Sequence, residues 1–366
     1  MLWQTYREQF PVTKNLVYLN HASIAPLCPP SAAAMRRLAT DVEEFGSFHY
    51  PEWLKVYEGI RAATARLINA APAEIAIVKN TSEGIATIAN GIEWRAGDRV
   101  VAFTEEFAAN FFPWKHLEQR GVSVTWLSIF DDLDKVDEAC RGARLLAVSF
   151  VQYLSGFRAD IVRMGEICAR RNCLFLVDAI QGLGAFPLDV RAANIDFLAA
   201  DGHKWLLGPE GCGILYVRAE RMEEVAPTEI GWTNTAKFAD YASRDMTWRR
   251  DAGRYECGTL NTIGCFGLHA ALEFNLKVGV DNIAPEVQAL ADRVWEGAQS
   301  RGFEMLGRRS PSTGAGIVSF RKPGEEGLGK RLKEAGFITA PRAGWVRVSP
   351  HFYNSPEDIE RLLALL

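Results

Sequence analysis

Long apolar runs, repeats and low-complexity tracts are absent from this 366-residue sequence. A membrane-spanning helix needs about 20 consecutive apolar residues, so we expect no membrane partner. The first ten residues, MLWQTYREQF, mix charges with aromatic rings, unlike a signal peptide. The net charge of −4 is too small to favour a nucleic-acid partner. With 48% hydrophobic and 23% charged residues, the composition is typical of a globular protein, and we expect a cytoplasmic location.

The seven cysteines show neither a disulfide framework nor a metal-binding pattern. Their number is odd, and no two of them form a CxxC pair. Cys168 and Cys173 flank the end of a predicted helix, and their spacing does not match a zinc knuckle. We therefore expect reduced, mostly buried thiols and no metal site. The cysteines are Cys28, Cys140, Cys168, Cys173, Cys212, Cys257 and Cys265.

No GxGxxG fingerprint follows the first predicted strand, which argues against a nicotinamide-dependent dehydrogenase. The sequence instead alternates short apolar strands with helices. This alternation predicts an α/β fold in which a mostly parallel seven-stranded sheet carries helices on both faces. The expected strands are 75–79, 99–104, 122–127, 144–150, 174–178, 197–200 and 214–217, and the helices among them are 85–91, 108–119, 133–140 and 161–171.

The length of the chain favours two domains. We expect a large domain over residues 15–264, and a smaller α+β domain made of residues 1–14 and 265–366. Two serines are predicted helix caps: Ser31 for a helix over 31–45, and Ser355 for the last helix, with proline in its first turn. Further helices are expected over 261–278, 285–301 and 327–335, and strands over 316–320 and 345–349.

Chemically useful side chains follow several of the predicted strands. In a doubly wound sheet, ligands bind beyond the carboxyl ends of the strands, so these residues are expected to share one site. They are Thr81, Ser82, Phe107, Tyr153, Asp178 and Lys204.

Lys204 and Asp178 together suggest a pyridine aldehyde cofactor. A partly desolvated lysine can form a Schiff base with the aldehyde, and an acid can keep the pyridine nitrogen protonated. Gln181 would then contact the phenolic oxygen of the ring. Each residue also has a simpler interpretation, because Lys204 could lie on the surface, Asp178 could cap a helix, and Gln181 could be a solvated loop amide.

The segment Asn80–Gly84 fits a phosphate site, because it lies between a strand and a helix whose first N–H groups lack acceptors. A capping box uses the same residue types. Phe107 could stack on an aromatic ring or fill the core. Arg347, with Arg342 as the weaker candidate, could bind a substrate carboxylate through its guanidinium fork or form a salt bridge at the rim.

Six blocks in order resemble the class V aminotransferase family of fold-type I pyridoxal-phosphate (PLP) enzymes, over nearly the whole chain from Val17 onwards. The resemblance is greatest to the cysteine desulfurase/selenocysteine lyase group and to the isopenicillin N epimerase-like group. The blocks are NTSEG (80–84), EEFAANFFPW (105–114), VDAIQ (177–181), DGHKWLLGPEGCGILY (201–216), RYECGTLNT (254–262) and RVSPHFYNSPEDI (347–359).

The resemblance implies a role for each matching position. Lys204 would be the Schiff-base lysine and general base, Asp178 the pyridinium partner, Gln181 the contact of the ring oxygen, and Phe107 the stacking residue. Arg347 would bind the α-carboxylate of the substrate. A homodimer with shared sites is implied, because Thr259 matches a residue that reaches the phosphate of the other subunit. The remaining phosphate-side positions are Thr81, Ser82, Asp201 and His203.

Three departures from the desulfurase-like pattern bear on the reaction. Phe107 stands where those enzymes have histidine, and it cannot move protons. The stretch 341–345 before Arg347 is short and lacks their nucleophilic cysteine, which disfavours persulfide formation on the enzyme. Asp201 is an acid beside a presumed anion, which it would repel unless protonated or turned away.

These observations predict a PLP-dependent enzyme that acts on an α-amino acid. Transamination is the first choice, a C–S lyase or an amino-acid epimerase is the alternative, and a non-catalytic relative is the remaining possibility. His21 and His49 are candidate substrate contacts, although each could equally serve packing, and His49 could serve the site of a partner subunit.

Overall fold

The computed structural model describes all 366 residues, and a seven-stranded sheet forms its centre. β8 is antiparallel to both of its neighbours, and all other adjacent pairs of strands in the sheet are parallel. The predicted α/β fold with a mostly parallel sheet is therefore confirmed. In spatial order the strands are β2 (Ile75–Val78), β8 (Gly213–Val217), β7 (Phe197–Asp201), β6 (Leu174–Asp178), β5 (Leu145–Ser149), β3 (Arg99–Phe103) and β4 (Ser123–Leu127).

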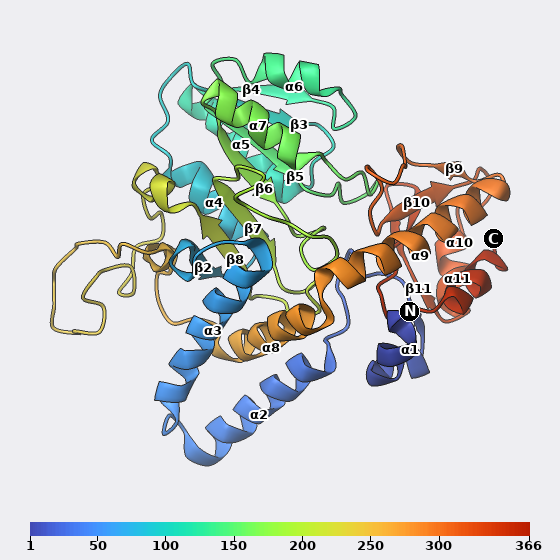
Figure 1. Ribbon diagram of the computed structural model, residues 1–366, viewed down its shortest axis with the longest axis horizontal. Coiled ribbons are helices and arrows are strands. Elements are labelled where there is room, and N and C mark those ends of the chain that lie inside the picture. Colours follow the sequence, from blue (N-terminus) through green and yellow to red (C-terminus); the bar gives the residue numbers. More distant parts are fainter.

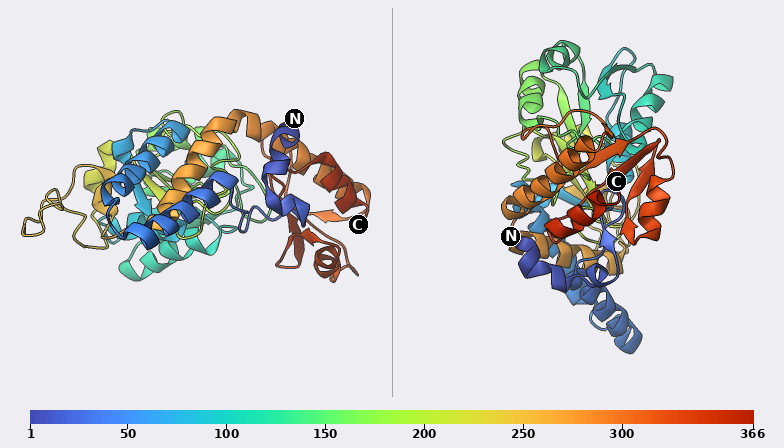
Figure 2. Two further views of the ribbon diagram at one scale, coloured as in Figure 1. Left: turned by 90° about the horizontal axis from the view of Figure 1, so that it is seen from below. Right: turned by 90° about the vertical axis from the view of Figure 1, so that its right-hand side faces the viewer.

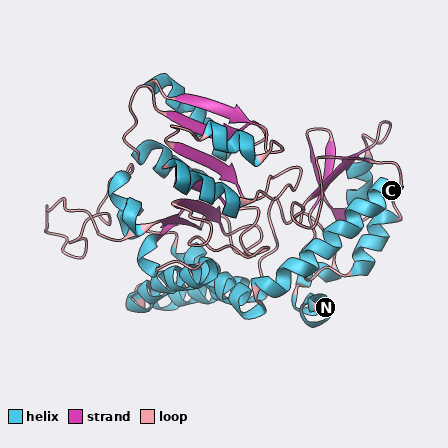
Figure 3. Cartoon of the chain, turned by 45° about the horizontal axis from the view of Figure 1, so that its top comes forward, coloured by secondary structure: helices cyan, strands magenta, loops and turns pink.

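The two faces of this sheet are covered by different helices, as Figure 3 shows. The strands are buried on both faces, so their side chains alternate between two apolar clusters. In β6, Phe175 and Val177 point to one cluster, and Leu174 and Leu176 point to the other. The first cluster includes α3 (Tyr50–Ile68), α6 (Leu133–Ala139), α7 (Ile161–Arg171) and α8 (Thr262–Val278), and the second includes α4 (Thr81–Gly91) and α5 (Phe112–Leu117).

A smaller lobe lies to one side of the sheet (Figure 1). Its antiparallel sheet has the order β12 (Ala340–Arg342), β13 (Trp345–Val348), β10 (Val318–Arg321) and β9 (Glu304–Met305). β1 (Val17–Tyr18) pairs separately with β11 (Phe337–Ile338). Its helices are α9 (Val280–Ser300), α10 (Leu328–Glu334) and α11 (Pro356–Leu363), and the N-terminal α1 (Leu2–Tyr6) lies beside them (Figures 1 and 2).

The proposed domain limits at residues 15 and 265 remain predictions, and two packing relationships favour a slightly different division. α8 packs on α3 and on α2 (Pro29–Phe45), and its buried face joins the core beneath the main sheet. Val17 and Leu19 lie in the core of the small lobe. These contacts favour a boundary at Gly279, where the chain passes from α8 into α9 with φ of 84°.

Several predicted helices have other limits in the structure. α2 begins at Pro29, and Ser31 lies inside it rather than at its cap, because proline is well tolerated in a first helical turn. α9 begins at Val280, five residues before the predicted start. The helix expected over 108–119 is interrupted at Phe111, before Pro113. The capping box at Ser355 is confirmed.

The segment 226–251 lacks regular structure and extends from the end of the molecule remote from the small lobe (Figure 1). No helix of the protein combines the length and the apolar character needed to cross a bilayer. The cytoplasmic location remains a prediction. Short 3-10 helices occur at Arg7–Gln9, Pro11–Lys14, Pro72–Glu74, Ala108–Asn110, Glu118–Arg120, Ala219–Glu224 and Ala252–Tyr255.

Candidate active site

A cavity of about 230 Å³ lies at the carboxyl ends of the parallel strands, where the small lobe meets the main sheet. It is lined by sixteen residues, of which eleven are candidates identified in the sequence. The expected convergence of strand ends is therefore observed. The eleven are Thr81, Ser82, Phe107, Tyr153, Asp178, Gln181, Asp201, His203, Lys204, Arg342 and Arg347.

Lys204 follows β7 and reaches into this cavity from its floor. Burial lowers the pKa of its amine to about 8, and the nearby Asp178 opposes part of that shift. A substantial fraction of the amine is therefore neutral near pH 8, as a nucleophile or a general base requires. Its Nζ lies 5.9 Å from the centre of the Phe107 ring, which places lysine and ring in one pocket.

Asp178 ends β6 and is only 2% exposed. Burial raises the pKa of its carboxyl to about 6, while a hydrogen bond from the Ile180 N–H and the charge of Lys204 lower it. Such a carboxylate is short of hydrogen bonds and is stabilised by a cation. A protonated pyridine nitrogen supplies both the charge and the donor, so the position fits the predicted partner.

The side chain of Gln181 is buried and hydrogen-bonded to two protein groups, so it is not a solvated loop amide. Its amide nitrogen donates to the Ala22 carbonyl at 2.9 Å, and its oxygen accepts from the Trp205 indole at 3.0 Å. The amide is therefore fixed at the cavity wall, and the second hydrogen of its nitrogen remains a donor for a ring oxygen.

The N-terminus of α4 lines the cavity through Asn80, Thr81 and Ser82. The Asn80 side chain caps the helix by accepting from the Glu83 N–H at 2.9 Å. The N–H groups of Thr81 and Ser82, the first two of the helix, have no acceptor within it, as an anion site requires. The phosphate and capping interpretations therefore both apply to this segment.

Asp201 and His203 lie next to this helix end. The backbone N–H of Asp201 donates to Thr81 Oγ1 at 3.0 Å, which ties β7 to α4. Asp201 Oδ2 lies 3.1 Å from His203 Nδ1, but the angle is not that of a hydrogen bond, and neither Asp201 Oδ1 nor His203 Nδ1 has a hydrogen-bond partner. Two buried polar groups thus face the cavity unsatisfied, which fits a polar ligand.

Arg347, on β13, supplies the positive charge on the small-lobe side and is 1% exposed. Its Nη1 donates to the Tyr153 carbonyl at 2.7 Å and its Nη2 to Ser23 Oγ at 2.6 Å, whereas its buried Nε has no partner. Burial and the neighbouring Arg342 lower its pKa to about 9. An anionic ligand would accept a hydrogen bond from Nε and would offset the repulsion between Arg347 and Arg342.

Two residues that contribute to the site, Ser23 and Glu106, were not among the sequence candidates for it. Ser23 positions both arginines. Glu106 directly precedes Phe107 and accepts hydrogen bonds from both the N–H and the hydroxyl of Ser149. Tyr153, which was expected in the site, places its ring 5.2 Å from that of Phe107. Glu106 could have been suspected from its place after β3, but no local pattern marks Ser23.

His21 and His49 do not reach the cavity. The ring nitrogens of His21 lie 2.8 Å from the Ser349 carbonyl and 2.6 Å from the Tyr353 hydroxyl, so it packs between the lobes. Burial accordingly lowers its pKa to about 4. His49 pairs with Asp41 at the remote end of α2 and α3, 2.7 Å from Nδ1 to Oδ1. Neither position supports substrate contact within one subunit.

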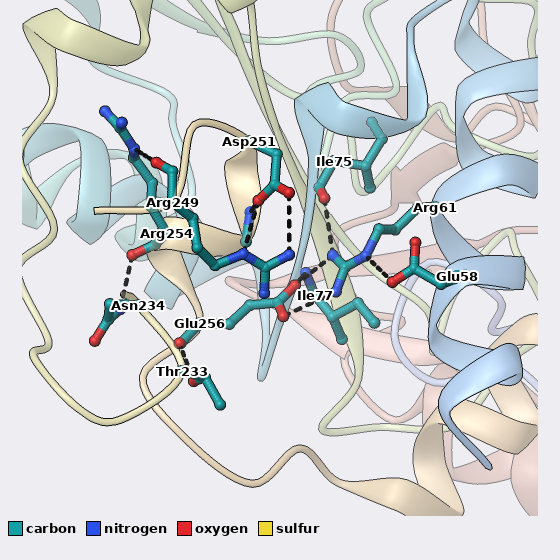
Figure 4. A network of polar contacts seen from close by, with 11 residues as sticks. Glu58, Arg61, Ile75, Ile77, Thr233, Asn234, Arg249, Asp251, Arg254 and Glu256 are labelled. Carbon is teal, nitrogen blue, oxygen red and sulfur yellow. Dashed lines mark hydrogen bonds and ion pairs between the residues drawn. The ribbon is translucent and has the colours of Figure 1, made fainter. Parts of the chain in front are cut away.

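Thr259 lines a separate cavity of about 120 Å³ beside β2. The loop that carries it is anchored by the buried carboxylate of Glu256, which accepts from Arg61 Nη2 at 2.9 Å and from the Ile77 N–H at 2.8 Å (Figure 4). Thr259 is thus held away from the Lys204 cavity of its own chain, by a network that fixes its backbone.

The family model described as Aminotransferase class-V matches residues 17–362. The chain belongs to this family. Because its members are PLP enzymes, the predicted cofactor and the expectation of an enzyme are confirmed. The unsatisfied groups fit that cofactor: Asp178 would hold its pyridine nitrogen, the N-terminus of α4 would hold its phosphate, and Lys204 would hold its aldehyde carbon.

Similarity to individual proteins extends over almost the whole chain. A probable cysteine desulfurase from Methanothermobacter thermautotrophicus is 30% identical, with 99% of this chain and 96% of the relative covered. The apo structure of a cysteine desulfurase from Thermococcus onnurineus has a TM-score of 0.91 and 26% identity, covering 99% of this chain and 96% of that one. A complex of the cystine C–S lyase C-DES has a TM-score of 0.89 at 24% identity, covering 97% and 98%, which shows the same fold.

Proposed function

We propose that this protein is a PLP-dependent C–S lyase, which removes sulfur by β-elimination from an α-amino acid of the cysteine type. The desulfurase relatives support a sulfur-containing amino acid as substrate. One observation carries the choice of elimination: none of the seven cysteines lines the cavity with Lys204. Within its own chain the site offers no thiol to accept sulfur, so the sulfur must leave as part of a small molecule.

The residues of the cavity divide this work. The guanidinium of Arg347 binds the α-carboxylate and thereby fixes which substituents of the α-carbon face Lys204. The neutral amine of Lys204 takes the α-proton. Bound PLP supplies the electron sink, which Asp178 maintains by keeping the pyridine nitrogen protonated. The β-carbon–sulfur bond breaks with its electron pair on sulfur, and water converts the remaining carbon skeleton to pyruvate and ammonia.

A product analysis tests this reaction against desulfuration. The PLP-loaded protein is incubated with L-cysteine, L-cystine or S-methyl-L-cysteine, and pyruvate, ammonia and alanine are quantified. Elimination predicts pyruvate and ammonia in equal amounts, whereas a desulfurase would leave alanine. Alanine as the main product, or no pyruvate from any sulfur amino acid, would overturn the proposal. Lys204→Ala serves as the control for reactions of free PLP.

Transamination, the first choice from the sequence, remains the second candidate because the matching family model describes aminotransferases. Its distinguishing result is spectroscopic. A transaminating enzyme mixed with an amino acid alone converts its cofactor to the amine form, and a keto acid reverses the change. If the cofactor keeps its original absorbance while pyruvate forms, transamination is excluded. Racemised substrate without pyruvate would instead indicate an epimerase.

A homodimer with shared sites completes the proposal. The exposed apolar side chains of the segment 226–251 and of the α2–α3 turn support an interface there, because such surface is costly to leave in water. Thr259 lies on the anchored loop beside this surface and away from its own Lys204. It is therefore available to the phosphate of a partner subunit.

A further inference from the structure

Three cysteines that are far apart in the sequence meet at the edge of the sheet opposite the active site. Cys140 ends α6 and precedes β5, Cys168 lies in α7, and Cys173 immediately precedes β6. All three are buried, and their sulfur atoms all lie within 4.8 Å of one another. Asp178 stands at the other end of β6, roughly 17 Å away for five residues at about 3.3 Å each.

The backbone holds this arrangement firmly. α7 ends at Arg171, the capping residue Asn172 adopts the left-handed conformation with φ of 53°, and the Cys173 N–H donates to the Cys168 carbonyl at 2.9 Å. The turn therefore folds Cys173 back against Cys168. The Cys140 N–H donates to the Val136 carbonyl at 3.0 Å, and α6 packs against α7. The three thiols thus come from the end of α6, the last turn of α7 and the residue before β6.

A small cavity adjoins two of these thiols, those of Cys168 and Cys173. It has a volume of about 60 Å³, and its other lining residues are Ala169, Asn172, Asn194, Asp196, Arg218 and Arg221. A space of this size holds at least one water molecule. Asp196 is not free to bind a ligand, since Oδ2 accepts from the Phe175 N–H at 3.0 Å and Oδ1 from Arg221 Nε at 3.1 Å. The cavity thus offers room for one further ligand.

We propose that Cys140, Cys168 and Cys173 bind one thiophilic d10 metal ion of the Zn²⁺ class, with a water molecule from the adjoining cavity as the fourth ligand. Tetrahedral Zn²⁺ takes thiolates at about 2.3 Å, which sets neighbouring sulfurs about 3.8 Å apart. The observed cluster needs to contract by about 1 Å at most. Three thiol protons leave to solvent as three metal–sulfur bonds form.

Sequence spacing does not reveal this group, because the third ligand lies 28 residues before Cys168 and is brought in by the packing of α6 on α7. The other buried cysteines lack such a set. Cys212 and Cys265 form a pair, 3.7 Å between sulfurs, and no third ligand joins them. The proposal does not depend on which amino acid the enzyme cleaves.

Titration with Cd²⁺ and Zn²⁺ tests the site on the PLP-loaded, reduced protein. We expect one ion per chain, thiolate-to-cadmium charge-transfer absorption, and at least about tenfold weaker binding for Cys140→Ala, Cys168→Ala and Cys173→Ala. Cys257→Ala is the matched control, since Cys257 is the most exposed thiol of the chain. Equal binding by the three variants and the wild type, or loss of binding in the control, would overturn the proposal.

A second measurement needs no variant and therefore survives any loss of folding. The wild-type protein is alkylated with and without Zn²⁺, and the modified cysteines are mapped by mass spectrometry. The proposal requires that Zn²⁺ protect Cys140, Cys168 and Cys173 together and leave Cys257 reactive. Protection of any other set, or of none, contradicts it.

Discussion

Arg347 Nη2 donates a 2.6 Å hydrogen bond to Ser23 Oγ, which joins the small-lobe strand β13 to the segment that follows β1. Arg342 contacts the same hydroxyl from β12, 3.2 Å from its Nη2. One serine therefore orients two arginines that repel each other, and it fixes the plane of the buried guanidinium. The position of the anion site depends on this contact as much as on the arginine itself.

We expect Arg347→Lys to raise the KM for the amino acid about 10- to 100-fold, because a single ammonium cannot replace a fork of charge-assisted hydrogen bonds worth roughly 1.5–3 kcal/mol. Steady-state kinetics measures the change. Arg342→Lys is the matched control and should alter KM far less, since Arg342 is exposed. Equal effects of the two substitutions would contradict the assignment of the carboxylate to Arg347.

The contrast between Arg347 and Ser23 illustrates what the sequence could and could not reveal. Lys204 and Asp178 lie at or just after the carboxyl ends of strands, and these ends of a parallel sheet share one edge, so their convergence follows from the alternating pattern. Arg347 lies on β13 of the separate antiparallel sheet, and its place in the site was expected from the resemblance to the family. Ser23 lies in an irregular segment between β1 and α2, and its contacts to β12 and β13 depend on tertiary packing alone. The predicted start of α2 was wrong because proline is tolerated within the first turn of a helix, so Pro29 does not mark a position before it.

The uptake of PLP by cofactor-free protein should depend on the ionisation of Lys204. Its lowered pKa of about 8 means that the nucleophilic amine increases as the pH rises from 6.5 to 9.5. We therefore expect the rate of uptake, followed by absorbance, to rise with pH and to have its midpoint near 8. Lys204→Ala should show no such absorbance change. A midpoint near 10.5, the ordinary value for lysine, would mean that the amine is exposed to solvent.

Glu106 should make the protein less stable as the pH rises through the neutral range. Burial raises its pKa from 4.5 to about 8, with a contribution from the charge of Asp178. Between these values the folded state holds a proton that the unfolded state has released, so the free energy of unfolding falls with increasing pH. Glu106→Gln keeps the contacts to Ser149 and removes the titration.

Urea unfolding between pH 6.5 and 8 measures this effect. In that window Asp178, with a folded pKa of about 6, is largely ionised in both states. Lys204, with a folded pKa of about 8, adds stability as the pH approaches 8, but it does so equally in the wild type and in Glu106→Gln. The wild type should lose stability across the window, and Glu106→Gln should lose less. Parallel pH profiles for the two proteins would show that Glu106 is already ionised in the folded state.

The shared dimeric site predicts a specific result when an inactive variant, Lys204→Ala, is combined with an impaired one, Thr259→Ala. In Lys204→Ala the lysine is missing, and in Thr259→Ala the phosphate contact is missing, which should weaken PLP binding and lower activity at limiting PLP. If Thr259 serves the partner subunit, a mixed dimer contains one site with both residues intact and one site with neither. If Thr259 serves its own subunit, no site in the mixed dimer regains both.

Co-expression of the two variants with different affinity tags allows this test. Random pairing puts half of the chains in mixed dimers, so about one quarter of wild-type sites should be restored. After tandem purification, the mixed dimer alone should carry one functional site per two chains, measured as PLP content and as turnover at limiting PLP. Activity no higher than that of the Thr259→Ala dimer would place Thr259 in its own subunit. If sedimentation velocity shows a monomer, the proposed homodimer is wrong, and so is the role of His49 in the site of a partner subunit.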